Sequence, residues 1–469
     1  MFLGIERQPA DRLAVVDNAG NRLTYGDLCD YARKIGSQVC ARHLVFQLCK
    51  NEAGSLAGYL GMVDSGAVPL VLSNKIDKNL LNTLLETYTP AYLWIPTDMQ
   101  GDFAFEPVYT ALDYVLLKTG NEAYPIHDDL QFLMTTSGST GSPKLVRYKK
   151  GNLEANAKNV ALAFGWTAEE RGICDLGMQY TMGLNVINSH LYAGATVLLT
   201  THNLMSGDFW DYIKKEQGTN FTGVPFSYEI FARLRFQRMD LPYLTTLAEG
   251  GGKLTDKRYT ELAEYAKNTG KRFIATFGTT ETAARMAMLP AELALEKTGS
   301  IGRAIPNGEL LLVDDEGNEL PMDVSEGELA YRGPNVTMGY AVCKEDLAMG
   351  DVWKGQYRTG DLARRDADGC YYITGRKSRF LKLLSYRVSL DQCEQMIQQQ
   401  FGMECACAGT DERMDIYVTD ASVSGDVRSF ISEKTGLFAN LFKVIVVDSI
   451  PRNDSGKIAY KLLSNGDNQ

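Results

Sequence analysis

Short β-rich runs alternate along this chain with stretches that favour helices. Three of the runs read as buried strands: LQFLMTT at 130–136, ATVLLT at 195–200 and KRFIATF at 271–277. Such an alternation is typical of a largely parallel α/β core, because parallel strands are joined by helical crossovers. The sequence therefore predicts an α/β fold for most of the chain.

The pattern changes between residues 308 and 340. The segment ELLLVDDEGNELP combines an apolar run, an Asp-Glu-Gly-Asn turn and a second short run, and GELAYRG follows it. Strands joined by so short a turn pair antiparallel. We expect an antiparallel or β-barrel-like subdomain here.

A compact unit follows residue 376. Ser389 and Gln392 have the spacing of a capping box, and Gly402 suits the end of the helix that they open. The strand-like segments DIYVTD and FKVIVVD flank a second helix that begins at about Asp426. We expect an N-terminal domain at 1–376 and a small α+β domain at 377–469.

Composition excludes several function classes. A net charge of −10 disfavours a nucleic-acid partner, and no apolar run approaches the roughly 18 residues of a membrane span. The first residues, MFLGIERQPADR, become charged too early for a signal peptide. Nine scattered cysteines fit a reducing cytoplasm, and we expect Cys405 and Cys407 to be buried thiols rather than zinc ligands.

The segment TTSGSTGSPK at 135–144 is rich in hydroxyls and glycines. A strand that ends in such a segment offers backbone N–H groups and hydroxyls to phosphate oxygens. It is not a Walker loop, because Lys144 follows Pro143 and precedes Leu145 instead of leading into a helix. On these residues alone, a phosphate site and a surface loop both remain open.

Further motifs follow in a fixed order. They are LTYGDL (23–28), TSGSTGSPK (136–144), LAEGGGKL (247–254), FGTTE (277–281), GELAYRGPNVTMGY (327–340), YRTGDL (357–362), GRKSRFLK (375–382) and NDSGKI (453–458). Together they resemble the AMP-forming adenylating enzymes, which include acyl-CoA synthetases, nonribosomal peptide adenylation domains and luciferases. The resemblance covers nearly the whole chain.

The resemblance implies a reaction in two halves. A carboxylate first attacks the α-phosphate of ATP and releases pyrophosphate, and a thiol then takes the acyl group from the acyl-adenylate. The thiol belongs to CoA or to the phosphopantetheine arm of a separate acyl or peptidyl carrier protein. Since carboxylate and triphosphate repel each other, the first half depends on cations and preorganised donors.

Site residues carry over by motif. Glu281 would hold Mg²⁺, Thr280 would donate to the α-phosphate, and Asp361 with Arg376 would bind the ribose. The implied nucleotide site comprises Thr136, Ser137, Gly138, Ser139, Thr140, Gly141, Lys144, Gly251, Gly252, Lys253, Phe277, Gly278, Thr279, Asp361 and Arg376.

The C-terminal unit carries the implied catalytic lysine, Lys457. Its ammonium would bridge the substrate carboxylate and the α-phosphate during adenylation only. The resemblance also implies that the unit at 377–469 is a mobile lid that pivots at Ser378, where the family usually has Asp or Lys. Ser385 replaces a glycine that lets backbone approach pantetheine, so thiol transfer could use an altered channel or be lost.

Segment 175–199 aligns with one wall of the acid pocket. The pocket residues that we expect are Tyr180, Thr181, Gly183 and Gly223. Thr181 stands where amino-acid-activating domains place an aspartate, which disfavours an α-amino acid. The mostly neutral lining favours an aryl or fatty acid.

Two other functions stay open. The chain could be an inactive adenylate-binding homologue, although Lys457, Glu281 and Asp361 are all present. Alternatively, the adenylate could be transferred to an amine rather than a thiol, which Ser385 leaves possible.

Overall fold

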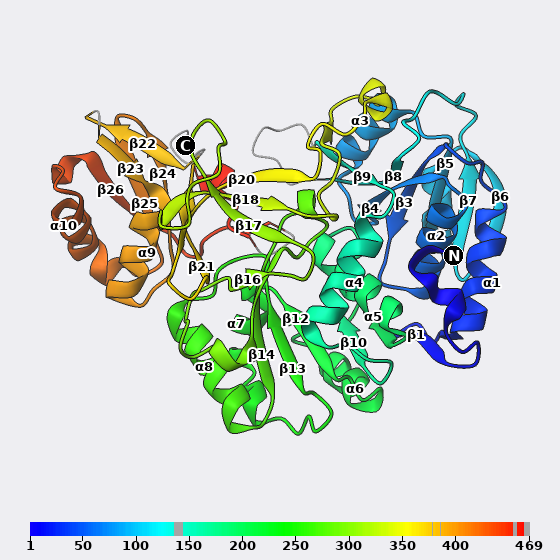
Figure 1. Cartoon of the computed structure of the whole chain (residues 1–469), viewed down its shortest axis with the longest axis horizontal. Helices are drawn as coiled ribbons and strands as arrows, with labels where there is room; N and C mark the ends of the chain where they lie inside the picture. The colour runs from blue at the N-terminus through cyan, green and yellow to red at the C-terminus, as the bar shows by residue number, and fades with distance from the viewer. Residues whose placement is uncertain (136–143, 378, 385, 454–456, 464–469) are drawn as a thin grey trace.

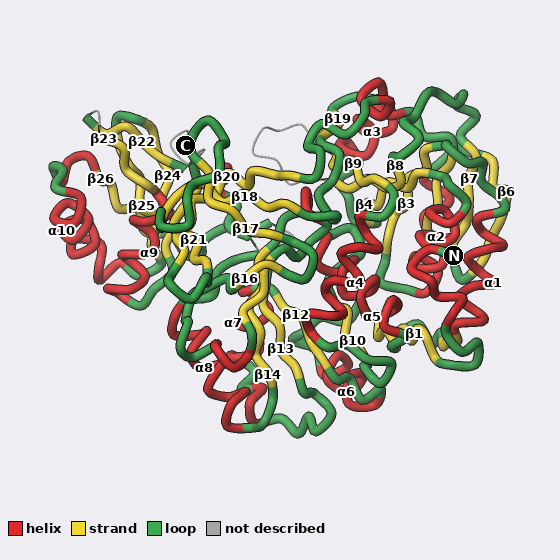
Figure 2. Tube along the Cα trace, viewed as in Figure 1, coloured by secondary structure: helices red, strands yellow, loops and turns green. Residues whose placement is uncertain are grey.

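A large N-terminal domain contains three sheets, and a small domain follows it at the C-terminal end (Figure 1). The structure is a computed structural model that describes residues 1–135, 144–377, 379–384, 386–453 and 457–463. Figure 2 shows helices on both sides of the strands in the large domain. This arrangement is the mixed α/β fold that the sequence predicts.

Sheet A has the strand order β16-β15-β14-β13-β12-β10-β11-β1-β2, with a parallel centre from β14 to β1. Its strands are β1 (Leu13–Asp17), β2 (Arg22–Thr24), β10 (Arg171–Cys174), β11 (Thr196–Leu199), β12 (Asn220–Gly223), β13 (Thr246–Glu249), β14 (Arg272–Phe277), β15 (Ala287–Leu289) and β16 (Arg303–Ala304). The strands predicted at 195–200 and 271–277 are β11 and β14.

Sheet B has the order β19-β9-β8-β4-β3-β5-β7-β6, parallel from β8 to β5. Its strands are β3 (Leu44–Cys49), β4 (Val68–Ser73), β5 (Tyr92–Pro96), β6 (Glu106–Ala111), β7 (Tyr114–Lys118), β8 (Leu130–Thr135), β9 (Leu145–Lys149) and β19 (Tyr340–Ala341). The strand predicted at 130–136 is β8. Strand β3 is buried throughout, as expected of a strand covered on both faces.

Sheet C is the antiparallel subdomain that the sequence predicts. Its order is β17-β18-β20-β21, with bounds Glu309–Val313, Glu326–Arg332, Gln356–Arg365 and Tyr371–Arg376. The hairpin expected within ELLLVDDEGNELP does not form as two strands. Its second run makes only an isolated bridge from Glu319 to Val313 because Pro321 follows at once, and β17 pairs with β18 instead.

Helices cover both faces of sheet A. α6, α7 and α8 pack on one face, whereas α4 and α5 lie on the other. The helices of the large domain are α1 (Tyr25–Gly36), α2 (Ala53–Asp64), α3 (Lys78–Tyr88), α4 (Asn152–Phe164), α5 (Thr181–Ala193), α6 (Gly207–Lys215), α7 (Pro225–Arg233) and α8 (Asp256–Asn268).

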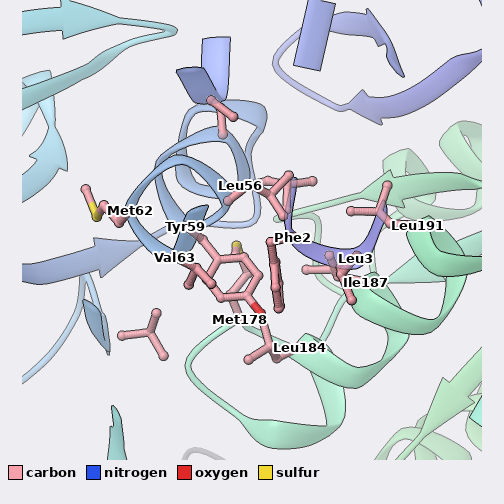
Figure 3. Packing of buried hydrophobic residues seen from close by; sticks show 14 of the residues in the cluster. Phe2, Leu3, Leu56, Tyr59, Met62, Val63, Met178, Leu184, Ile187 and Leu191 are labelled. Atoms are coloured by element: carbon pink, nitrogen blue, oxygen red, sulfur yellow. The ribbon is translucent and has the colours of Figure 1, made fainter. Parts of the chain in front are cut away.

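Short 3-10 segments link these elements. They are η1 (Phe2–Arg7), η2 (Thr97–Asp102), η3 (Phe236–Arg238), η4 (Thr280–Thr282), η5 (Ala291–Leu293) and η6 (Lys344–Ala348). Figure 3 shows residues of η1 packed among side chains of α2 and α5, with the Phe2 ring 5.6 Å from that of Tyr59. This packing joins the helices between sheets A and B.

The C-terminal domain has its own core. It contains β22 (Phe380–Leu383), β23 (Tyr386–Ser389), α9 (Leu390–Phe401), β24 (Cys405–Thr410), β25 (Arg413–Val418), η7 (Ala421–Val423), α10 (Ser424–Thr435), η8 (Ala439–Leu441), β26 (Phe442–Val446) and α11 (Tyr460–Leu463). Ser389 Oγ accepts from the Gln392 backbone, which is one half of the predicted capping box, and Gly402 ends α9 in a left-handed conformation, as predicted.

Two further findings on the described residues concern membrane spans and the cysteines. No helix among them is long and apolar enough to span a membrane. Cys405 and Cys407 are buried thiols on β24, and burial raises the pKa of each. They therefore agree with the structural role that we expected for them.

Candidate active site

Glu281 lies in the short helix η4, directly after the end of β14. Its carboxylate accepts a hydrogen bond from the Tyr340 hydroxyl at 2.7 Å, and its backbone oxygen accepts from Thr337 N at 3.0 Å. The Tyr148 hydroxyl donates to Thr280 O at 2.7 Å. Sheet B and the segment before β19 thus hold the predicted magnesium ligand in place.

Lys144 approaches the same tyrosine from the other side. Its ammonium lies 4.4 Å from the centre of the Tyr340 ring, within the range of a cation–π contact. Tyr340 therefore connects the end of the predicted phosphate segment to Glu281. Phe277 and Thr279 flank this turn: Phe277 is half-buried, and Thr279 is the N-cap of η4.

Asp361 and Arg376 are cross-strand neighbours on β20 and β21. Arg376 Nε donates to Asp361 Oδ1 at 3.0 Å. Burial raises the pKa of Asp361, while the guanidinium opposes that shift. A buried carboxylate beside a largely exposed arginine has the acceptor capacity that the predicted ribose-binding role requires.

Lys457 is an exposed residue of the C-terminal domain. Although it contacts solvent, desolvation by the surrounding protein lowers its pKa, and Arg376 lowers it further. Glu281 and Asp361 act in the opposite direction and raise the pKa. The lysine of the small domain is therefore close enough to interact electrostatically with both carboxylates of the large domain.

The glycine-rich turn after β13 is more open. Gly251 has φ +80°, a conformation that favours glycine, and Gly252 and Lys253 are exposed. The turn lies beside the first turn of α7, since a Cβ on Gly252 would meet Pro225 at 3.0 Å. This position at the carboxyl edge of a parallel sheet suits a ligand-binding turn.

The expected acid-pocket residues lie around the start of α5. Thr181 lines a cavity of about 10 Å³ together with Met134, Tyr148, Leu153, Asn156, Leu184, Asn185, Asn188 and Ala283. Tyr180 is the N-cap of α5. A Cβ on Gly183 would lie 2.4 Å from Leu176 O, and one on Gly223 would lie 2.9 Å from the Tyr228 ring. Both glycines thus permit close packing and do not line this cavity.

Several expected site residues lie outside the described residues. They are Thr136, Ser137, Gly138, Ser139, Thr140, Gly141, the pivot Ser378 and the substituted Ser385. The structure therefore places the two ends of the phosphate segment, Thr135 on β8 and Lys144 before β9.

The donor set fits magnesium bound together with ATP. Within the described ranges, no group of three or more His, Cys, Asp or Glu could hold a metal ion by itself. Mg²⁺ commonly keeps its waters and binds one or two carboxylates plus substrate phosphates. Glu281 supplies one such carboxylate next to the predicted phosphate segment.

The model of the AMP-binding enzyme family matches residues 4–341, which is most of the chain. The chain belongs to the AMP-binding enzyme family. An indoleacetate–CoA ligase from Aromatoleum aromaticum is 30% identical over 338 residues, or 69% of this AMP-binding enzyme and 64% of that ligase.

Solved structures share the whole fold. An O-succinylbenzoate coenzyme A synthetase from Bacillus subtilis in complex with AMP has a TM-score of 0.79 at 20% identity and covers 98% of this chain and 97% of its own. The same synthetase has been solved with ATP and a magnesium ion. The amide bond synthetase McbA from Marinactinospora thermotolerans has a TM-score of 0.80 at 20% identity and covers 98% of this chain and 99% of its own.

Sequence reasoning missed two residues in and beside the candidate site. Tyr340 ends a motif that we recognised, but nothing local shows that its hydroxyl reaches Glu281. Arg285 was also missed, although a lone arginine in the small, apolar stretch AARMAML is an unusual signal. The structure buries its guanidinium beside Asn185 and Thr222.

Proposed function

We propose that this AMP-binding enzyme activates a carboxylic acid as acyl-AMP, releases pyrophosphate and transfers the acyl group to a thiol. One observation carries the proposal: Lys457 of the small domain interacts electrostatically with Glu281 and Asp361 of the large domain. The Glu281 carboxylate and the Lys144 cation lie together at the end of the predicted phosphate segment, and Lys457 would add a second cation where the two reacting anions meet.

The residues divide the work as follows. Glu281 holds Mg²⁺ on the phosphates, and its contact with Tyr340 fixes the carboxylate direction. Lys144 adds positive charge at the phosphate segment. Asp361 accepts from the ribose, and Lys457 offsets the repulsion between the two reacting anions.

We propose the domain boundary at 376/377 and the pivot at Ser378. Strand β21 ends at Arg376 and β22 begins at Phe380, so the connection is short. The Lys377 ammonium is tied to Glu328 at 3.0 Å and to Asp315 at 2.7 Å on the large domain. Rotation just after this anchor would carry Lys457 away before thiol transfer.

The acceptor that we propose is CoA, with phosphopantetheine on a separate carrier protein as the alternative. The name of the CoA ligase relative supports the first choice. The sequence favours an aryl or fatty acid. Nine free thiols fit the reducing cytoplasm, where we propose that the enzyme acts.

The test is pyrophosphate release with ATP, Mg²⁺ and a panel of aryl, fatty, dicarboxylic and amino acids. We expect release with at least one acid class, followed by thioester formation when CoA is added. Product analysis with CoA, a phosphopantetheinylated carrier protein and simple amines in parallel identifies the acceptor. An amide product would mean that an amine, and not a thiol, accepts the acyl group. Absence of pyrophosphate release with every acid would overturn the proposed activity.

A further inference from the structure

Arg285 is a buried cation in the large domain, between η4 and β15. Its side chain is only 1% exposed. The guanidinium carbon lies 4.8 Å from the centre of the Phe164 ring on α4. Since charged side chains are seldom fully buried without an opposite charge, this arginine needs a partner.

The partners of Arg285 in the described residues are neutral. Nη1 donates to Asn185 Oδ1, and Nη2 donates to Thr222 Oγ1 at 3.0 Å. In the same ranges the buried Nε has no hydrogen-bond partner, and Arg285 forms no salt bridge. Burial lowers its pKa to about 10, so it remains charged at neutral pH.

These contacts place the guanidinium beside segments that the sequence assigns to the acid pocket. Asn185 belongs to the segment 175–199 and lines the same small cavity as Thr181. Thr222 lies next to Gly223 on β12, and because Phe221 packs with the cluster under α7, Thr222 points to the opposite face, toward α5.

The surroundings of Arg285 are polar as well as tightly packed. Asn185 Nδ2 donates to Asn156 Oδ1 at 2.6 Å, and Asn156 Nδ2 donates to Arg285 O at 2.8 Å. The adjoining cavity has room for about one water. A long alkyl chain would leave the charge and these amides facing hydrocarbon, at a large cost in desolvation.

We propose that Arg285 binds a second carboxylate at the far end of the acid, so that the enzyme activates a dicarboxylic acid. This inference rests on the proposed function and narrows its substrate class. The planar guanidinium can donate two parallel hydrogen bonds to a carboxylate. In this complex the carboxylate replaces Asn185 Oδ1 on Nη1 and satisfies Nε.

The first experiment compares matched acids in the wild-type enzyme. Pyrophosphate release is measured with straight-chain and benzene dicarboxylic acids and with the monomethyl ester of each. The ester keeps the size of the acid but removes one charge. We expect kcat/KM for at least one dicarboxylic acid to exceed that of its ester by about 10- to 100-fold, since hydrogen bonds to charged groups are worth about 1.5–3 kcal/mol.

The second experiment uses Arg285→Met, which removes the charge with little change in volume. We expect it to lower kcat/KM for the dicarboxylic acid by a similar factor and to leave the ester unchanged or improved, with the Kd for ATP unaltered. Arg285→Lys should retain part of the preference. The control is Arg272→Met on β14, where the arginine contacts Phe164 O and the Trp166 ring and should not affect acid selectivity.

Two results would overturn the inference. Equal use of dicarboxylic acids and esters by the wild-type enzyme would show that Arg285 only supports the core, and the proposed function would survive. Equal losses for both substrates in Arg285→Met would lead to the same conclusion. If no acid releases pyrophosphate, the proposed function and the inference both fail. If Arg285→Met does not fold, the wild-type comparison of acids with esters and the Arg285→Lys variant still test whether Arg285 binds a carboxylate.

Discussion

Glu249 is a buried carboxyl group, and burial disfavours its ionised form. It is the last residue of β13, only 5% exposed, and its Oε1 has no hydrogen-bond partner in the described ranges. Burial raises the pKa of the nearby Tyr228 and Tyr259 hydroxyls, and Glu249 adds to both shifts. Burial raises its own pKa to about 8.

This shift predicts a pH dependence of stability. Between the unfolded pKa of about 4.5 and the folded pKa of about 8, the folded protein holds a proton that the unfolded chain releases. Raising the pH through this window should destabilise the wild type relative to Glu249→Gln, by up to about 1.4 kcal/mol per pH unit. Denaturant unfolding at several pH values within the window measures this, and parallel profiles for the two proteins would contradict it.

The turn between β14 and η4 depends on one glycine. A Cβ on Gly278 would lie 1.3 Å from Ala284 O, because the chain folds back through Ala283 and Ala284 with φ of 57° and 102°. These positive φ values are already unfavourable for alanine. The close approach explains how Glu281 is held at the edge of sheet A.

Gly278→Ala should therefore distort this element. We expect a loss of about 3 kcal/mol in stability and a large loss of pyrophosphate release, since the added methyl group meets backbone. Gly425→Ala on α10 is the control, because its Cβ would face open space and should stabilise the helix by about 0.5–1 kcal/mol. Similar melting temperatures for the two variants would argue against a special role for the turn.

Arg379 ties the elements of the small domain together. It pairs with Glu394 on α9 at 2.8 Å, donates to Cys407 O on β24 at 2.7 Å and donates to the Tyr460 hydroxyl at 3.0 Å. Since Tyr460 lies three residues after Lys457, the segment from Lys457 to Tyr460 is anchored to the same core as α9. The small domain should therefore move as one body.

Replacing Arg379 by Met leaves Glu394 buried without its cation, a change that typically costs 3–5 kcal/mol. We expect limited proteolysis of Arg379→Met to degrade the small domain and leave a resistant fragment that ends near residue 376. Arg428→Met on α10, whose side chain is exposed, should resemble wild type. Simultaneous loss of both domains would mean that they do not fold independently.

Local signals explain which elements could be predicted from the sequence. The apolar runs at β8, β11 and β14 are buried strands because both faces of a parallel sheet are covered. Ser389 and Gly402 define α9 through contacts within a few residues. Arg285 and Tyr340 could not be assigned, because their partners are contributed by distant segments, such as Thr222 and Glu281.

At the scale of the whole molecule, we propose that the two domains complete one site. Desolvation lowers the pKa of Lys457 in the small domain, and Glu281 and Asp361 in the large domain oppose this shift. If the lysine serves adenylation alone, the two half-reactions must respond differently to its removal.

The most direct measurement is the rate of each half-reaction in Lys457→Ala, with Lys434→Ala on the exposed side of α10 as the control. We expect pyrophosphate release to fall on the order of 10²- to 10³-fold, while thioester formation from supplied acyl-adenylate stays near the wild-type rate. Equal losses in both half-reactions would contradict a role for Lys457 in adenylation alone.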